Sequence, residues 1–168
     1  DNESFNELVR LQTTSGVFKD GAEAVNAFLA ESQFADTSVQ HTLSPSASKD
    51  AGLGGRNTTS VKDCGELLSR IYKGECVSKE ASEAMLNLLL NQQVTTKIPS
   101  GISASVEIAN KTGETDTDQH DIAIVYGEKT TYILCVMSEN CKSGDAVSHI
   151  RDISGIVYNY LNMRLDQD

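Results

Sequence analysis

The residues best suited to chemistry in this sequence are the tripeptide Lys111-Thr112-Gly113, which lies within Ala-Asn-Lys-Thr-Gly-Glu at the end of a predicted strand. Attack on an acyl carbon needs a nucleophile, a base, and hydrogen-bond donors aimed at the developing oxyanion. An ammonium, a hydroxyl and the backbone beside a glycine are groups of the donor kind. The chain therefore supplies the donor side of such chemistry.

The candidate nucleophiles and bases lie where the sequence predicts no partner or no helix to position them. Ser46 and Lys49 have the spacing Ser-x-x-Lys, but they fall in a loop-like stretch where no helix can present both side chains on one face. His41 and His149 have no Cys or Ser partner placed beside them. We interpret the Ser-x-x-Lys match as a chance one and give neither histidine a catalytic role.

The four cysteines show no metal-ligand spacing, because there is neither a Cys-x-x-Cys pair nor a partnering His-x-x-x-His. We expect no metal site and no cofactor. Cys64 and Cys76 bracket a predicted helix that holds them too far apart for a strain-free disulfide, whereas Cys135 and Cys141 flank a possible turn. The disulfide state, and with it the redox compartment, stays open at this point.

The first part of the chain has helical periodicity. The apolar residues predict two short helices, then a long surface loop, then two clearer helices. Ser60 or Thr59 can start the third helix, with Asp63 completing a capping box, and Gly74 ends it; Ser78 is the cap candidate of the fourth. The expected helices cover residues 5–11, 22–29, 60–73 and 81–91, and the loop covers about 36–57.

Beyond Pro99 the period changes to two, which predicts an antiparallel meander of three strands followed by a long amphipathic helix. The fold class is therefore α+β. We expect two parts: a partial helical subdomain at 1–99, and a sheet with its C-terminal helix at 100–168. The strands are expected at 106–111, 122–126 and 132–137, and the last helix at 147–161.

Composition excludes several classes of protein. The 168 residues are 39% hydrophobic and 23% charged, which is typical of a globular domain. The net charge of -10 repels nucleic acid and anionic lipid, and the 14 Lys and Arg form no basic stripe. The longest apolar run, at 132–137, is far shorter than the roughly 20 residues of a membrane-spanning helix.

With this context, the chain resembles the C-terminal portion of class A β-lactamases and penicillin-binding serine hydrolases. Lys111-Thr112-Gly113 is similar to their Lys-Thr-Gly motif, and the strands and helix after it follow the same series. Asp1-Asn2, with Asn6 four residues on, resembles a Ser-Asp-Asn motif that lacks its leading Ser. The segments 21–29 and 57–60 are similar to the helix before the family's omega loop and to the entry of its next helix.

The resemblance implies a β-lactamase/transpeptidase-like fold whose N-terminal part is missing. It gives catalytic roles to Asn2, which would hold the substrate amide and the absent lysine, and to Lys111, which would bind the substrate carboxylate with Thr112. Gly113 would let the substrate approach the strand, and the backbone N–H of Glu114 would form half of the oxyanion hole. The same comparison makes His120 a further carboxylate contact, on the strand beside Lys111.

The chain departs from the family pattern at two places. No Ser-x-x-Lys helix precedes Asp1, so we expect this chain alone to be inactive and its own N-terminal segment to be a possible partner. The deacylating glutamate would fall near Leu43, and the loop contains no Glu.

Two functions are left open by these departures. One is a hydrolase acting on β-lactams or D-Ala-D-Ala stem peptides of peptidoglycan. The other is a penicillin-sensing or peptidoglycan-binding domain that reports antibiotic exposure. The family implies a secreted or cell-envelope location for both.

Overall fold

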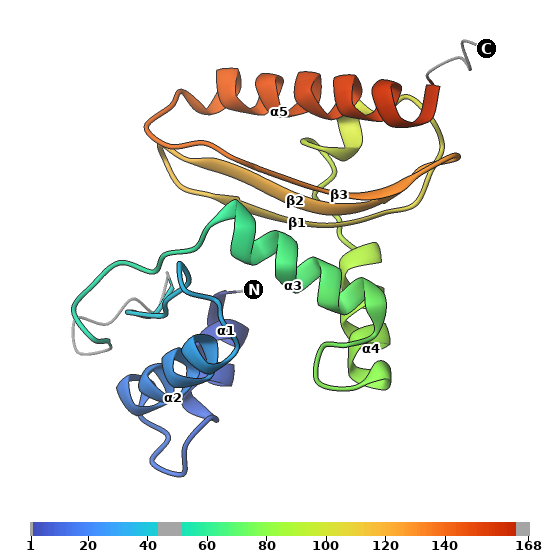
Figure 1. Ribbon diagram of the computed structural model, residues 1–168. Coiled ribbons are helices and arrows are strands. Elements are labelled where there is room, and N and C mark those ends of the chain that lie inside the picture. The colour runs from blue at the N-terminus through green and yellow to red at the C-terminus, as the bar shows by residue number, and fades with distance from the viewer. Residues whose placement is uncertain (1, 44–51, 164–168) are drawn as a thin grey trace. The chain divides into compact units, whose positions relative to one another are not determined.

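The computed structural model describes residues 2–43 and 52–163 and is drawn in Figure 1. The chain divides into two compact units, Asp1–Asp63 and Cys64–Asp168. The change from helices to strands near residue 99 lies inside the second unit, because two helices share that unit with the sheet. Each unit has its own hydrophobic core and is described separately.

The first unit is built around two packed helices, α1 (Asn2–Arg10) and α2 (Phe18–Glu31). The pair is close because Gly21 has no side chain, and a Cβ there would overlap the carbonyl of Val9. The rings of Phe5 and Phe18 pack at a centroid distance of 6.5 Å. The buried residues of this core are Val9, Phe18, Ala22 and Val39.

Both helices were expected, but α2 begins earlier than its periodicity predicts. Phe18 is buried and starts the helix, whereas Phe28, which was expected on the buried stripe, is 59% exposed. The expected stripe is therefore wrong at Phe28. The buried residues of α2 lie in its N-terminal half, because that half contacts α1.

The expected loop at 36–57 is described at 36–43 and 52–57, where it contains no helix and is organised by two isolated β-bridges. Ser38 pairs with Thr58, and His41 pairs with Gly52. The Ser46–Lys49 match lies outside the described residues.

Helix α3 (Val61–Lys73) has the start and the end that the sequence predicts. Ser60 Oγ accepts a hydrogen bond from the Asp63 backbone N–H at 3.2 Å. Gly74 has φ +75° and closes the helix, with the next residue's N–H donating to the Arg70 carbonyl at 2.8 Å. Helix α4 (Lys79–Leu90) starts at the cap Ser78, as expected.

The expected capping box is only half formed, because the Asp63 carboxylate has other partners. It accepts from the Asp36 N–H at 2.9 Å and from the Thr37 hydroxyl at 2.8 Å. This buried carboxylate therefore anchors the start of the loop instead of the helix N-terminus.

The second unit contains an antiparallel sheet in the order β1-β2-β3, formed by β1 (Ile108–Glu114), β2 (Gln119–Tyr126) and β3 (Thr131–Met137). The expected meander is confirmed, although β1 differs from its expected bounds at both ends and β2 and β3 begin earlier than expected. β1 extends through Glu114, so the Lys-Thr-Gly tripeptide lies within the strand. β2 begins three residues earlier than its apolar run, because the polar Gln119 and Asp121 are buried in the pairing.

Each face of this sheet is covered by helices (Figure 1). On one face, Ala123 and Val125 pack with Ile150 and Tyr158 of α5 (Ser143–Tyr158), which ends in a π-helical turn, η2 (Asn159–Met163). The short η1 (Pro99–Gly101) also contacts α5. On the other face, Ala109 and Ile124 pack with Leu68 of α3 and with Leu86, Leu89 and Leu90 of α4. The fold is α+β, as expected.

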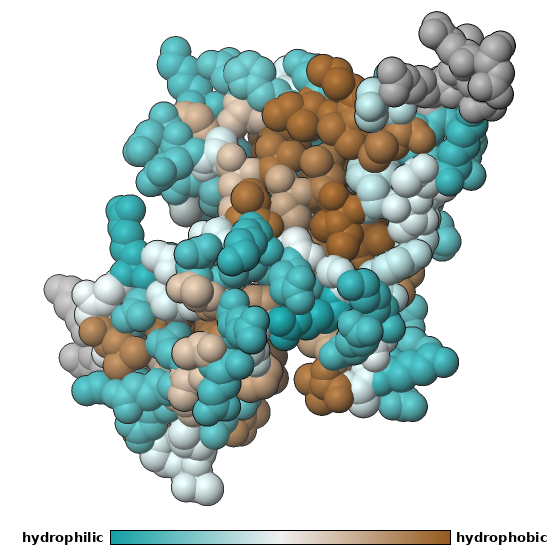
Figure 2. Space-filling view, in the orientation of Figure 1, coloured by the Kyte–Doolittle hydropathy of each residue, from teal (hydrophilic) through white to brown (hydrophobic). Residues whose placement is uncertain are grey.

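Hydrophobic surface gathers beside α5 and the sheet (Figure 2). Ile153, Ile156 and Tyr160 are 40%, 69% and 60% exposed, although they share the expected apolar stripe of this helix. Every residue of β3 after Thr131 is only half-buried.

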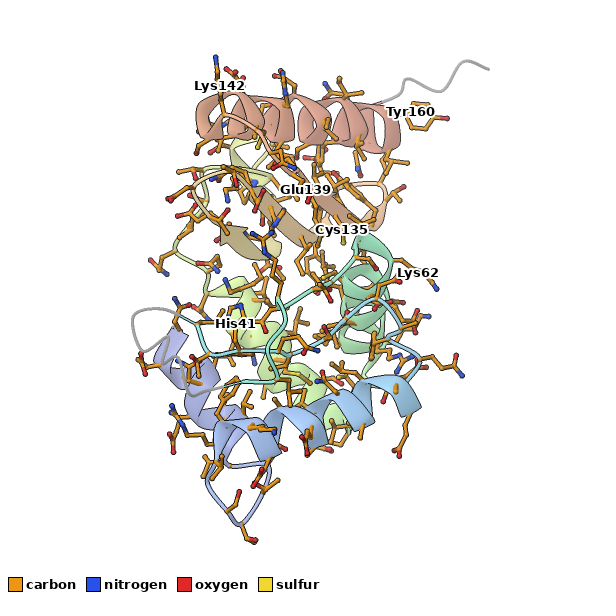
Figure 3. All side chains as sticks on the ribbon, turned by 90° about the vertical axis from the view of Figure 1, so that its left-hand side faces the viewer. His41, Lys62, Cys135, Glu139, Lys142 and Tyr160 are labelled. Carbon is orange, nitrogen blue, oxygen red and sulfur yellow. The ribbon has the colours of Figure 1, made fainter. Side chains whose placement is uncertain are left out.

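None of the four cysteines forms a disulfide in the structure. Cys135 of β3 lies against α3 (Figure 3), with its Sγ 3.8 Å from the Cβ position at Gly65. Among the described helices, none combines the length and the hydropathy that crossing a bilayer requires.

Candidate functional site

The Lys-Thr-Gly tripeptide occupies the outer strand of the described sheet. Lys111, Thr112 and Gly113 of β1 pair with Ile122, Asp121 and His120 of β2, respectively. No described strand pairs with the other side of β1. Backbone groups on that side of the strand therefore have no strand partner among the described residues.

The pairing register determines which side chains share a face, because side chains alternate along a strand and paired residues point the same way. Ala109 faces α3 and α4, so Lys111 and Gly113 face the same way, together with His120. Thr112 lies on the α5 side of the sheet.

Lys111 is exposed, and its ammonium donates a hydrogen bond to the Thr112 carbonyl. It forms no ion pair with a described carboxylate. A surface ammonium held only by a neutral carbonyl can pair with an anion without first breaking a salt bridge.

His120 lies directly beside the glycine of the tripeptide. Its Cδ2 is 3.5 Å from the Cβ position at Gly113. Its Nδ1 is buried and has no hydrogen-bond partner among the described residues. The ring nitrogen therefore needs a partner, which a bound water or ligand can provide.

A buried polar network lies under the tripeptide on the α5 side of the sheet. Asp121 is fully buried, and it accepts from the Ile98 N–H at 2.9 Å and from Asn110 Nδ2 at 3.1 Å. Burial raises the pKa of Asp121, while these two hydrogen bonds and the charge of Lys97 oppose the rise. Asn110, which precedes Lys111, is thus hydrogen-bonded to Asp121, the register partner of Thr112.

Sequence reasoning did not find this network. Lys97, Asn110 and Asp121 lie far apart along the chain, and each alone resembles an ordinary surface residue. The one available signal was the position of Asn110 and Asp121 next to the candidate site residues Lys111 and His120.

In the first unit, the candidate Asn2 begins α1 and is exposed. One helical turn later, Asn6 is fully buried. Its Nδ2 donates to the Leu43 carbonyl at 3.0 Å, and its Oδ1 accepts from the Leu43 N–H at 2.8 Å. The side-chain amide thus pairs with the backbone of Leu43 as a neighbouring strand would.

Two more asparagines hold the described part of the loop in the same way. Asn26 of α2 exchanges two hydrogen bonds with the backbone of Val39, both at 2.8 Å. Asn57 accepts from the Gln40 and His41 N–H groups and donates to the His41 carbonyl. The sequence pointed to Asn6 through its spacing from Asn2, but it gave no comparable signal for Asn26.

The family model of the beta-lactamase enzyme family matches residues 1–161, so the chain belongs to this family. Solved structures agree with this assignment. The structure of PBP-A is 24% identical with a TM-score of 0.71, over 83% of this chain and 51% of that chain. A β-lactamase from Sphaerobacter thermophilus DSM 20745 is 22% identical with a TM-score of 0.71, over 84% and 54%.

The extended-spectrum β-lactamase TLA-1 is 21% identical with a TM-score of 0.72, over 95% of this chain and 63% of that chain. Identities this low show the common fold. The chain spans between half and two thirds of the length of these structures, so it contains part of that fold. A search of curated proteins found no match to this chain.

Proposed function

We propose that this chain is the C-terminal part of a class A β-lactamase-like serine hydrolase that binds β-lactams or D-Ala-D-Ala peptides and is acylated by them. The observation that carries this proposal is the Lys-Thr-Gly tripeptide on the outer strand β1, in a chain of the β-lactamase family. A neighbour in the same comparison is a leucine-to-glutamate variant of PBP-A in an acyl-enzyme complex with penicillin G.

Most of the proposed ligand contacts come from one stretch of β1 and from its neighbour β2, and one comes from α1. Lys111 and the Thr112 hydroxyl bind the substrate carboxylate, and Gly113 leaves room for the substrate along the strand. The Glu114 N–H forms half of the oxyanion hole. His120 adds a contact to the carboxylate through its unpartnered ring, and Asn2 binds the substrate amide.

The nucleophilic serine and its lysine come, on this proposal, from an N-terminal segment of the parent protein, and residues 1–168 alone are inactive. Two features of the second unit support a further segment. β3 has no described strand on its outer side, and three apolar side chains of the C-terminal helical segment are exposed, Ile153 and Ile156 of α5 and Tyr160 of η2. Unpaired strand edges and clustered apolar side chains are typical of surfaces that another segment covers.

A second candidate is a penicillin-sensing or peptidoglycan-binding domain that is acylated without turnover. Two points favour it: the family's deacylating glutamate would fall near Leu43, where this chain has no Glu, and the backbone of Leu43 is anchored by Asn6. Both candidates act on substrates outside the cytoplasm, so a secreted or cell-envelope location belongs to the proposal.

Nitrocefin and intact-mass analysis of the full-length protein test the proposal. We expect a covalent adduct, and we expect Lys111→Ala to reduce its rate of formation at least tenfold, since the carboxylate loses a charged partner. The matched control is Lys79→Ala on α4, where the lysine side chain is 78% exposed. Steady turnover identifies a hydrolase, a stoichiometric burst identifies a sensor, and the absence of any adduct contradicts both.

A further inference from the structure

Lys97 is a buried cation directly beneath the candidate site. Its side chain is 1% exposed, and its Nζ donates to the Gly113 carbonyl and to the His120 carbonyl, both at 3.1 Å. The carboxylate of Glu114 lies 3.5 Å away. The two carbonyls use two of the three ammonium donors, and the Glu114 carboxylate is an ion-pair partner of the same ammonium.

The two carbonyls belong to one cross-strand pair. Gly113 and His120 are register partners, and the Thr115 N–H donates to the Asp118 carbonyl at the end of the same ladder. Hydrogen-bonded pairs alternate with non-bonded pairs in an antiparallel ladder, so Gly113 and His120 form a bonded pair, as Thr115 and Asp118 do. The next residue, Glu114, is then in a non-bonded pair, and its N–H points away from β2.

The Gly113 carbonyl and the Glu114 N–H are two ends of one peptide unit. This unit is planar and trans, so its C=O and N–H point in opposite directions. Lys97, which donates to the Gly113 carbonyl, therefore also fixes the direction of the Glu114 N–H, which points away from β2. A cation on the carbonyl also polarises the unit and strengthens the N–H as a donor.

The segment that carries Lys97 is itself held in place. Its neighbour Ile98 donates to Asp121, and the Ile98 carbonyl accepts from the Ser154 hydroxyl of α5 at 2.8 Å. On the other side, the Thr96 carbonyl accepts from Arg151 Nε at 2.6 Å. The ammonium is therefore positioned by both the sheet and α5 before any ligand binds.

We propose that Lys97 is a positioning residue for acylation: its buried ammonium holds the Gly113–Glu114 peptide unit so that the Glu114 N–H faces the developing oxyanion. The inference rests on the proposed function and adds a residue outside the Lys-Thr-Gly motif. Lys97 touches no substrate. Its effect falls on the transition state, because an oxyanion forms only there.

The test compares Lys97→Met with Lys79→Met in the full-length protein. We expect Lys97→Met to slow acylation by nitrocefin roughly tenfold, which is less than the ~10²–10³ lost with an oxyanion donor itself. The dissociation constant of the noncovalent complex should stay within about twofold, because the carboxylate contacts are intact. The Glu114 amide resonance should shift in Lys97→Met and not in Lys79→Met.

Other outcomes overturn the proposal in distinguishable ways. Wild-type protein that forms no adduct overturns the proposed function and this inference together. If the wild-type protein is acylated, two results for Lys97→Met overturn the role of Lys97 alone. One is acylation as fast as in the wild type. The other is a loss of noncovalent affinity as large as the loss of acylation rate.

Should Lys97→Met fail to fold, Lys97→Arg decides. It keeps the charge but changes the donor geometry. Acylation slowed several-fold at unchanged affinity supports the role, and unchanged acylation overturns it.

Discussion

Asn6 and Leu43 are joined by two hydrogen bonds across 37 residues of sequence, one in each direction between a buried side-chain amide and a backbone. The pair fastens the described end of the loop to α1. It also fixes the backbone of Leu43 independently of its side chain, which makes the two residues separately testable.

Replacing Asn6 by alanine should lower the free energy of unfolding of the full-length protein by about 2 kcal/mol. The change leaves the Leu43 N–H and carbonyl without partners in a partly buried setting, and such groups cost ~1–3 kcal/mol. Urea unfolding measures the effect. Asn87→Ala on the exposed face of α4 is the control, and its change should stay within about 0.5 kcal/mol. Equal effects of the two substitutions would contradict the anchoring role.

Leu43→Glu should shorten the lifetime of the acyl-enzyme by at least tenfold. Both anchoring bonds use the backbone of Leu43, so a carboxylate enters without disturbing them, and a positioned general base contributes ~10²–10⁴-fold. The measurement is the decay of the penicillin adduct by intact mass. Leu43→Gln has the same size without a base and should keep the slow decay. Equally fast decay in both variants would show that the carboxylate is not the cause.

Gly101→Ala should destabilise the second unit by about 1–3 kcal/mol, as overpacking does in tight cores. A Cβ at Gly101 would lie 2.2 Å from the Arg151 carbonyl oxygen and 2.9 Å from Ser154 Cβ. Gly144→Ala, in the first turn of α5, meets no atom within 4 Å and should be neutral or stabilising by up to ~1 kcal/mol. Thermal unfolding of both variants checks the contrast, and a stable Gly101→Ala protein would argue against the close packing of η1 on α5.

Cys135 should react slowly with iodoacetamide at pH 8. Burial, with smaller effects from Cys64 and Asp121, raises its pKa from near 9 to about 11, and the thiolate is the reactive form. A thiol pKa raised on folding means that ionisation of Cys135 opposes the folded state. The contribution of the neutral thiol to the free energy of unfolding is fully present below about pH 9 and is lost as the pH rises through about 11.

Peptide mapping after timed alkylation should show Cys135 labelled later than Cys76, with the difference removed in urea. Equal labelling of the two thiols in the folded protein would contradict the raised pKa of Cys135.

The order of the elements could be predicted from the sequence, because helix and strand periods are local properties. The stripes through α3 and α5, the cap at Ser78 and the stop at Gly74 each depend on residues within a few positions. The Lys-Thr-Gly tripeptide was placed on the first strand for the same reason. The family membership that followed from this order is confirmed by the match over residues 1–161.

Strand boundaries were less predictable where polar residues are buried. Gln119 and Asp121 interrupt the apolar pattern, yet both lie in β2, because Asp121 finds two donors that are distant in sequence and Gln119 pairs with Ser138. The Asp63 carboxylate was likewise assigned to its own helix, and it instead binds the backbone and side chain of the loop start.

What the sequence alone determined is which segments become helix or strand and which chemical groups the outer strand carries, since both depend on neighbours along the chain. The tertiary structure decided how those groups are held. Lys97 reaches the Gly113 carbonyl over 16 residues, and Asn6 reaches Leu43 over 37. Such partners are chosen by the packing of distant elements, because a buried donor bonds to whichever acceptor the fold brings to it.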